Sequence, residues 1–103
     1  GIEILMGSEV DILKEGSLDY PDSILEKLDV VIASVHSGFH MKESEMTKRI
    51  IKAVENHFVH IIGHPTGRLL GRRDPYAVNV DAIIDAAAEN RKSLEINAYP
   101  RPP

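Results

Sequence analysis

The sequence has few aromatic residues and lacks residue types that mark particular protein classes. Its 103 residues include no cysteine, no tryptophan, three tyrosines and two phenylalanines. Without cysteine the chain forms neither disulfides nor thiolate metal sites, as is usual for cytoplasmic proteins. No apolar run approaches the ~20 residues that a membrane-spanning helix needs, and no basic segment followed by an apolar one suggests a signal peptide. We therefore expect a cytoplasmic location and no membrane partner.

A strong positive charge is also missing. The formal net charge is −4, whereas domains that bind nucleic acid through phosphate contacts usually carry a basic excess or patch. The basic residues cluster only at Arg68, Arg72 and Arg73. If the chain acts on DNA, we expect a partner domain to supply the affinity. Both ends of the sequence have the pattern of strands, so we expect a piece of a larger protein.

Apolar and amphipathic stretches alternate along the chain. We predict strands over residues 2–13 (one long or broken strand), 30–35, 58–62 and 94–97, and helices from Pro21 and over roughly 42–55 and 80–88. The run 30–35 is almost continuously apolar, which is typical of strands buried on both faces of a parallel sheet. The βα-βα-βα-β order predicts an α/β fold, with a parallel sheet or barrel covered by helices.

Candidate metal ligands follow the predicted strands. His36 comes directly after the run 30–35, His64 follows the next strand and Gly63, and Glu9 interrupts the first apolar segment. In parallel α/β folds the chemistry lies at the carboxyl ends of the strands, where two imidazoles and a carboxylate would suit Zn or Mn. Two loop histidines and an exposed edge glutamate would give the same pattern, and no local ligand motif such as HExxH decides between these interpretations.

Other polar residues are weaker candidates. Asp11 lies two residues from Glu9, so both side chains point to one face of a strand, where Asp11 is either a partner of a metal ligand or an ordinary strand-end acid. Arg68 is suited to bind a phosphate through two nitrogens, and Asn97 to hold a ligand or substrate phosphate, although both also fit simple loop positions. Three further histidines are not expected to be ligands: His40, His57 and His60.

Several segments, in order, resemble one known family. Residues 7–13 (GSEVDIL), 31–39 (VIASVHSGF), 62–73 (IGHPTGRLLGRR) and 94–98 (LEINA) are similar to motifs of the PHP (polymerase and histidinol phosphatase) domain attached to bacterial and archaeal family X DNA polymerases. The segment 62–73 is the most specific of these. The resemblance covers essentially the whole chain, residues 1–103.

The resemblance implies a distorted, TIM-like (β/α)7 barrel that binds up to three divalent ions, Mn or Zn, and hydrolyses phosphoesters. In the polymerase context the implied activity is 3′–5′ exonuclease or related 3′-end processing in DNA repair. Glu9 would correspond to a bridging carboxylate, and His36 and His64 to histidine ligands. The implied partners are DNA, the rest of the barrel and a nucleotidyltransferase domain of the parent polymerase.

The sequence also departs from the family pattern. An H-x-H motif and a further histidine that precede the glutamate segment are missing, as is the closing D-x-H motif. The chain therefore corresponds to a partial barrel with an incomplete ligand set, and we expect weak or no activity from it alone, together with self-association through unpaired sheet edges. Two other functions remain open: a small-molecule phosphatase such as histidinol phosphatase, and a non-catalytic domain that supports a polymerase.

Overall fold

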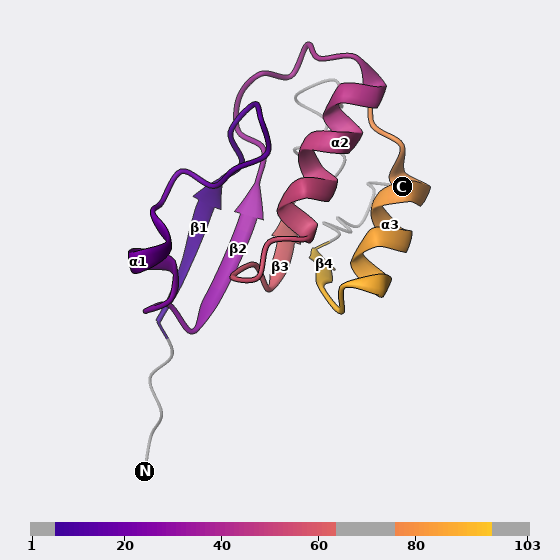
Figure 1. Ribbon diagram of the computed structural model, residues 1–103. Coiled ribbons are helices and arrows are strands. Elements are labelled where there is room, and N and C mark those ends of the chain that lie inside the picture. Colours follow the sequence, from indigo (N-terminus) through magenta and orange to yellow (C-terminus); the bar gives the residue numbers. More distant parts are fainter. Residues whose placement is uncertain (1–5, 64–75, 96–103) are drawn as a thin grey trace, which may run out of the picture.

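The computed structural model describes residues 6–63 and 76–95 as an α/β arrangement of one parallel sheet and three helices (Figure 1). The sheet has four strands in the order β1-β2-β3-β4, and each neighbouring pair is parallel. The elements are β1 (Gly7–Asp11), α1 (Asp22–Leu25), β2 (Val30–Ser34), α2 (Glu43–Val54), β3 (Ile61–Gly63), α3 (Val80–Glu89) and β4 (Ser93–Glu95). The predicted α/β class and the strand–helix order are thus confirmed. None of the helices in this part of the chain is long and apolar enough to cross a membrane.

The strand register divides the sheet into an apolar face and a polar face. Val10, Ala33, Ile62 and Leu94 are aligned across the four strands, and the first three are at most 1% exposed. The next position along each strand points to the opposite face. It is occupied by Asp11, Ser34, Gly63 and Glu95, again in register. Three polar residues and Gly63 therefore end the strands on one face of the sheet, called the polar face below, although Ile32 and Ile61 lie on the same face two positions earlier.

Helices α2 and α3 cover the apolar face (Figure 1). On α2, Met46, Ile50 and Val54 follow helical spacing and are fully buried, as the amphipathic pattern predicts. Helix α3 is rich in alanine and begins at Asn79, whose side chain accepts a hydrogen bond from the amide of Ala82. The hydrophobic core thus lies between the apolar face of the sheet and the two helices.

Two of the predicted boundaries differ from the structure as follows. Strand β3 begins only at Ile61, because Asn56 accepts hydrogen bonds from the amides of Phe58 and Val59 and folds that segment into a turn. The helix predicted from Pro21 is a single turn, Asp22–Leu25, and Leu28 lies beyond it. Within this turn Leu25 is buried, whereas the side chain of Ile24 is 43% exposed.

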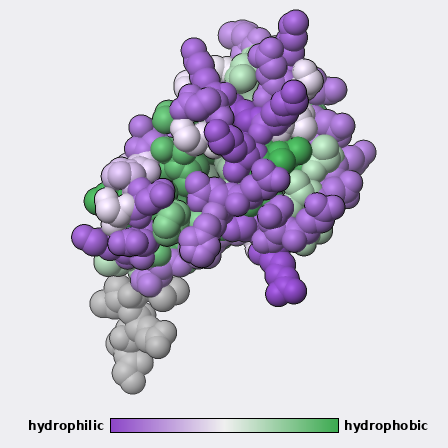
Figure 2. All heavy atoms as spheres, in the orientation of Figure 1, coloured by the Kyte–Doolittle hydropathy of each residue, from purple (hydrophilic) through white to green (hydrophobic). Residues whose placement is uncertain are grey.

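The surface is mostly hydrophilic, with apolar residues in separate patches on the face that Figure 2 shows. The large apolar side chains that are exposed in the described part of the chain are Met6, Tyr20, Ile24, Val80 and Ile84.

Strand β1 covers less than the predicted residues 2–13: among the described residues it runs from Gly7 to Asp11. After it, the chain turns back at Gly16, whose φ of 92° is open to glycine at little cost, and Ile12 pairs with Leu18 in an antiparallel bridge.

Candidate functional site

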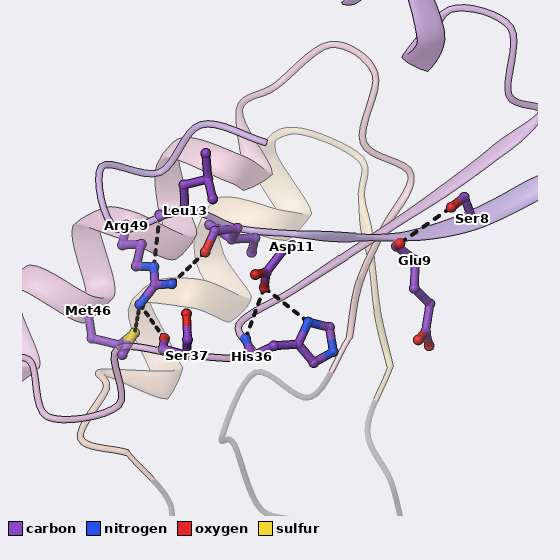
Figure 3. A network of polar contacts seen from close by, with 9 residues as sticks. Ser8, Glu9, Asp11, Leu13, His36, Ser37, Met46 and Arg49 are labelled. Carbon is purple, nitrogen blue, oxygen red and sulfur yellow. Dashed lines mark hydrogen bonds and ion pairs between the residues drawn. The ribbon is translucent and has the colours of Figure 1, made fainter. Parts of the chain in front are cut away.

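Asp11 and His36 form the best-defined polar contact at the carboxyl ends of the strands. Asp11 is the last residue of β1, and His36 lies two residues beyond the end of the neighbouring strand β2. The backbone amide of His36 donates a hydrogen bond of 3.1 Å to Oδ1 of Asp11, and the Nδ1 atom of His36 lies 3.0 Å from the same oxygen (Figure 3). Because a carboxylate accepts hydrogen bonds, the proton of the ring belongs on Nδ1.

This contact has a chemical consequence for the other ring nitrogen. A neutral imidazole with its proton on Nδ1 presents a lone pair on Nε2. Histidines that bind metal almost always donate their second ring nitrogen to a carboxylate or carbonyl, which fixes the tautomer and the ring orientation. The side chain of His36 is 49% exposed and that of Asp11 30%. His36 is therefore both oriented and accessible to a ligand.

Glu9 lies near this pair on the same strand. It precedes Asp11 by two residues, so the two carboxylates share a face of β1. In Figure 3 the side chains of Glu9 and His36 extend to the same side of the ribbon. Glu9 is exposed, and no side chain or amide in residues 6–63 and 76–95 donates a hydrogen bond to its carboxylate. The carboxylate of Glu9 thus has open lone pairs, and its side chain extends to the same side of β1 as the oriented imidazole of His36 (Figure 3).

Ser34 occupies the same polar face and was not singled out from the sequence. Its side chain is fully buried, and its hydroxyl has no hydrogen-bond partner among the described residues. The neighbouring strand contributes Gly63, where a methyl group would lie 2.5 Å from Oγ of Ser34 and 3.4 Å from Oε1 of Glu95. The glycine therefore leaves room for two polar side chains. Only the position of Ser34 two residues before His36 in the motif could have signalled it.

Arg49 is the second residue that sequence reasoning missed. It lies on α2 and is 2% exposed. Its guanidinium donates hydrogen bonds to backbone carbonyls that follow Asp11 and His36 in the chain (Figure 3). Burial lowers the pKa of Arg49, while the nearby charge of Asp11 raises it. Its place on an amphipathic helix gave no sign of this role, because arginines on helices usually face water.

Three of the predicted site residues, His64, Arg68 and Asn97, lie outside the described residues. Two of the histidines that were not expected to be ligands, His57 and His60, lie within them. At the opposite end of the sheet, Nδ1 of His60 accepts a hydrogen bond of 2.9 Å from the amide of Val31. His57 and His60 line an open hollow of about 430 Å³ there, together with Leu25, Glu26, Leu28 and Phe58.

The metal hypothesis can be tested against the donors at hand. Within residues 6–63 and 76–95, no three histidine, aspartate or glutamate side chains are grouped closely enough to hold a metal ion. The described residues instead offer one carboxylate, Glu9, and one imidazole nitrogen, Nε2 of His36. Both donor types suit Zn or Mn. A metal site that used these two donors would therefore require further donors to complete it.

Comparison with known proteins finds bacterial relatives of the chain. It is 48% identical over 97 residues to the DNA polymerase/3′-5′ exonuclease PolX of Bacillus subtilis (strain 168). It is 43% identical over 101 residues to a probable phosphatase of Thermoanaerobacter sp. (strain X514), and 40% identical over 101 residues to a probable phosphatase of Caldanaerobacter subterraneus subsp. tengcongensis. No family model matches the sequence.

These alignments cover 94% of this chain but much less of the relatives. The chain spans 17% of the length of PolX and 39% and 37% of the two probable phosphatases. The shared segment contains the strand ends that carry Glu9, Asp11 and His36. The chain is therefore a relative of PolX and of these probable phosphatases, and its resemblance to the PHP domain of family X DNA polymerases is confirmed.

Proposed function

We propose that this chain is part of a metal-dependent phosphoesterase domain of the PHP type, and that Glu9, His36 and His64 are ligands in its active site. The observation that carries the proposal is the contact between Asp11 and His36, which leaves Nε2 of His36 open on the side of β1 to which Glu9 also extends. In this proposal residues 1–103 form part of a distorted (β/α)7 barrel, and the polar face of the sheet faces the inside of that barrel.

Each described residue has a definite task in the proposed site. Glu9 binds metal through its carboxylate, and His36 through Nε2. Asp11 holds the proton on Nδ1 of His36 and fixes the orientation of the ring. Divalent ions held by these residues would supply a water molecule activated for attack on phosphorus and positive charge for the leaving oxygen. Arg68 and Asn97 would bind the phosphate of the substrate.

We propose DNA 3′ ends as the substrate, with the activity of a 3′–5′ exonuclease in DNA repair. The support is the 48% identity to a protein named DNA polymerase/3′-5′ exonuclease. The net charge of −4 means that other parts of a polymerase, such as a nucleotidyltransferase domain, would supply most of the affinity for DNA. Without those parts and the remaining ligands, we expect the 103 residues to have weak or no activity.

A small-molecule phosphatase is the second candidate, because relatives named probable phosphatases align with the same 94% of the chain. The two activities share the metal site and differ in the substrate. A comparison of hydrolysis of 3′-recessed DNA and histidinol phosphate by the complete polypeptide that contains these residues would separate them. Faster turnover of histidinol phosphate would overturn the proposal of a DNA substrate.

Metal binding can be tested separately from activity. Calorimetric titration of Mn²⁺ or Zn²⁺ into the complete polypeptide should show binding that weakens at least about tenfold in His36→Ala and Glu9→Gln. The matched control is His57→Ala, which removes an exposed histidine at the far end of the sheet. If His36→Ala binds both ions as tightly as the control does, His36 is not a ligand and the chain is better explained as a non-catalytic support.

A further inference from the structure

Arg49 is the one charged side chain that is buried in the described part of the chain. It projects from the middle of α2 toward the carboxyl ends of β1 and β2. Burying a cation is unfavourable unless its N–H groups are matched by acceptors. An apolar residue at this helix position would fill the same space at a lower cost. Packing alone therefore does not explain why a guanidinium is buried at this position.

The oxygen partners of Arg49 are all backbone carbonyls, and they come from two separate loops. Nε donates a hydrogen bond of 2.9 Å to the carbonyl of Leu13, and a terminal nitrogen donates to the carbonyl of Ile12. The other terminal nitrogen, Nη1, lies 3.0 Å from the carbonyl oxygen of Ser37 and 3.3 Å from that of Gly38. One planar group thus joins the loop that follows β1 to the loop that follows β2.

These loops are the ones that carry the site. Ile12 and Leu13 come directly after Asp11, and Ser37 and Gly38 directly after His36. The Asp11–His36 contact links positions 25 residues apart in the sequence. The β1–β2 ladder pairs Asp11 with Ser34. Beyond Ser34, the position of His36 depends on how the two loops are held relative to each other, and the guanidinium lies between their backbones (Figure 3).

The loop that follows β2 also approaches the guanidinium closely. Gly38 has a φ of 68°, in the region that favours glycine. A methyl group at this position would lie 3.1 Å from Nη1 of Arg49. The loop thus comes closer to the cation than a larger residue would comfortably allow, and its carbonyls point at the guanidinium.

We infer that Arg49 is a positioning residue for the proposed metal site: by binding the carbonyls of both loops, it sets the separation of Asp11 and His36. Only the part of this inference that concerns metal binding rests on the proposed function. Lysine cannot replace arginine in this role, because an ammonium group lacks the planar fork that reaches two loops at once. Methionine would preserve the packing volume and lose every hydrogen bond to the carbonyls.

The test uses four variants of the complete polypeptide that contains this chain. Arg49→Met and Arg49→Lys remove or weaken the link between the loops. Lys48→Met changes the exposed neighbour on the same helix, and Ile50→Val removes one methyl group from the core and leaves the guanidinium in place. Two quantities are measured: metal-free hydrogen exchange of the segment 34–40 by mass spectrometry, and the Mn²⁺ dissociation constant by calorimetry.

We expect Arg49→Met to speed exchange around His36 and to weaken Mn²⁺ binding, each by about tenfold or more. Arg49→Lys should lie between Arg49→Met and the wild type, and it provides the test if the methionine variant does not fold. Lys48→Met and Ile50→Val should keep the wild-type exchange of residues 34–40 and the wild-type Mn²⁺ affinity.

Two results would overturn the inference. One is wild-type exchange and Mn²⁺ affinity in both folded Arg49 variants. The other is an equal loss in Ile50→Val, which would mean that any weakening of α2 disturbs the site. Failure of the proposed function looks different: the wild type would bind no Mn²⁺, while the exchange measurement would still report whether Arg49 holds the loops.

Discussion

Oδ1 of Asp11 accepts two hydrogen bonds from a single residue, one from the backbone amide of His36 at 3.1 Å and one from its ring nitrogen Nδ1 at 3.0 Å. The amide bond fixes where His36 leaves strand β2, and the ring bond fixes the tautomer. One oxygen atom thus controls both the position and the protonation pattern of the imidazole. The contact is a property of the metal-free chain, and several measurable effects depend on it.

Replacing Asp11 with asparagine should weaken metal binding more than folding. The oxygen of the introduced amide would still accept hydrogen bonds, but the loss of the negative charge makes the His36 imidazole a poorer ligand. We expect the Mn²⁺ affinity to fall by about tenfold, with a change in unfolding free energy of about 1 kcal/mol or less. Calorimetry and denaturant unfolding measure the two effects. Asp85→Asn, at an exposed position of α3, is the control and should change neither; an unchanged affinity in Asp11→Asn would contradict this role.

Gly63 and Ser34 should show strong energetic coupling. A methyl group at Gly63 would lie 2.5 Å from Oγ of Ser34, so Gly63→Ala should destabilise the fold by roughly 1–3 kcal/mol. Ser34→Ala alone should be close to neutral, because it removes a buried hydroxyl without a partner among the described residues. The double variant should recover about 1 kcal/mol or more of the loss. Denaturant unfolding of all four proteins gives the coupling, and strictly additive effects would show that the hydroxyl is not the obstacle.

Tyr76 should make the stability of the protein sensitive to alkaline pH. It is 6% exposed and stacks on Phe39, with ring centroids 5.9 Å apart. Burial raises its pKa well above the ordinary value of about 10, and the charge of Arg49 opposes this shift only in part. The unfolded chain therefore loses this proton first, so the stabilisation is complete below pH ~10 and declines as the pH rises further.

The matching experiment compares the wild type with Tyr76→Phe. The difference in unfolding free energy between them should be constant from about pH 7 to 9 and should then shift against the wild type by roughly 1.4 kcal/mol per pH unit above about pH 10. Tyr20→Phe, at a position that is 41% exposed, is the control and should follow the wild type. Parallel pH curves for the wild type and Tyr76→Phe would rule out the assigned shift.

The start of α3 depends on a single side chain. Oδ1 of Asn79 accepts a hydrogen bond of 3.1 Å from the amide of Ala82, and the amide of Asn79 donates to Oγ1 of Thr47 on α2. Asn79→Ala should lower the unfolding free energy by about 1 kcal/mol, because an N-cap acceptor is lost. Asn79→Asp keeps an acceptor and should stay within a few tenths of the wild type. Equal losses in both variants would mean that the cap contributes little.

Much of the fold could be predicted from local pattern. The helix expected over roughly 42–55 is observed as Glu43–Val54, and the apolar run 30–35 is observed as the strand Val30–Ser34, in which Val30 and Ile32 are half-buried. Both have a strong periodicity that reflects burial on one or both sides. The predicted start of β3 at residue 58 was wrong, because side-chain and backbone bonds of Asn56 form a turn that apolar composition does not reveal.

The candidate site could likewise be predicted only in part from the pattern of single segments. The place of Glu9, Asp11 and His36 near strand ends follows from the alternation of apolar and turn segments, since parallel strands must bring their carboxyl ends to one edge. The pairing of Asp11 with His36, the buried Arg49 between their loops and the hydroxyl of Ser34 over Gly63 do not follow from it. Each depends on contacts between residues more than ten positions apart. Their distances are set by the pairing of β1, β2 and β3 and, for Arg49, by the packing of α2 on the sheet, rather than by the periodicity of any one segment.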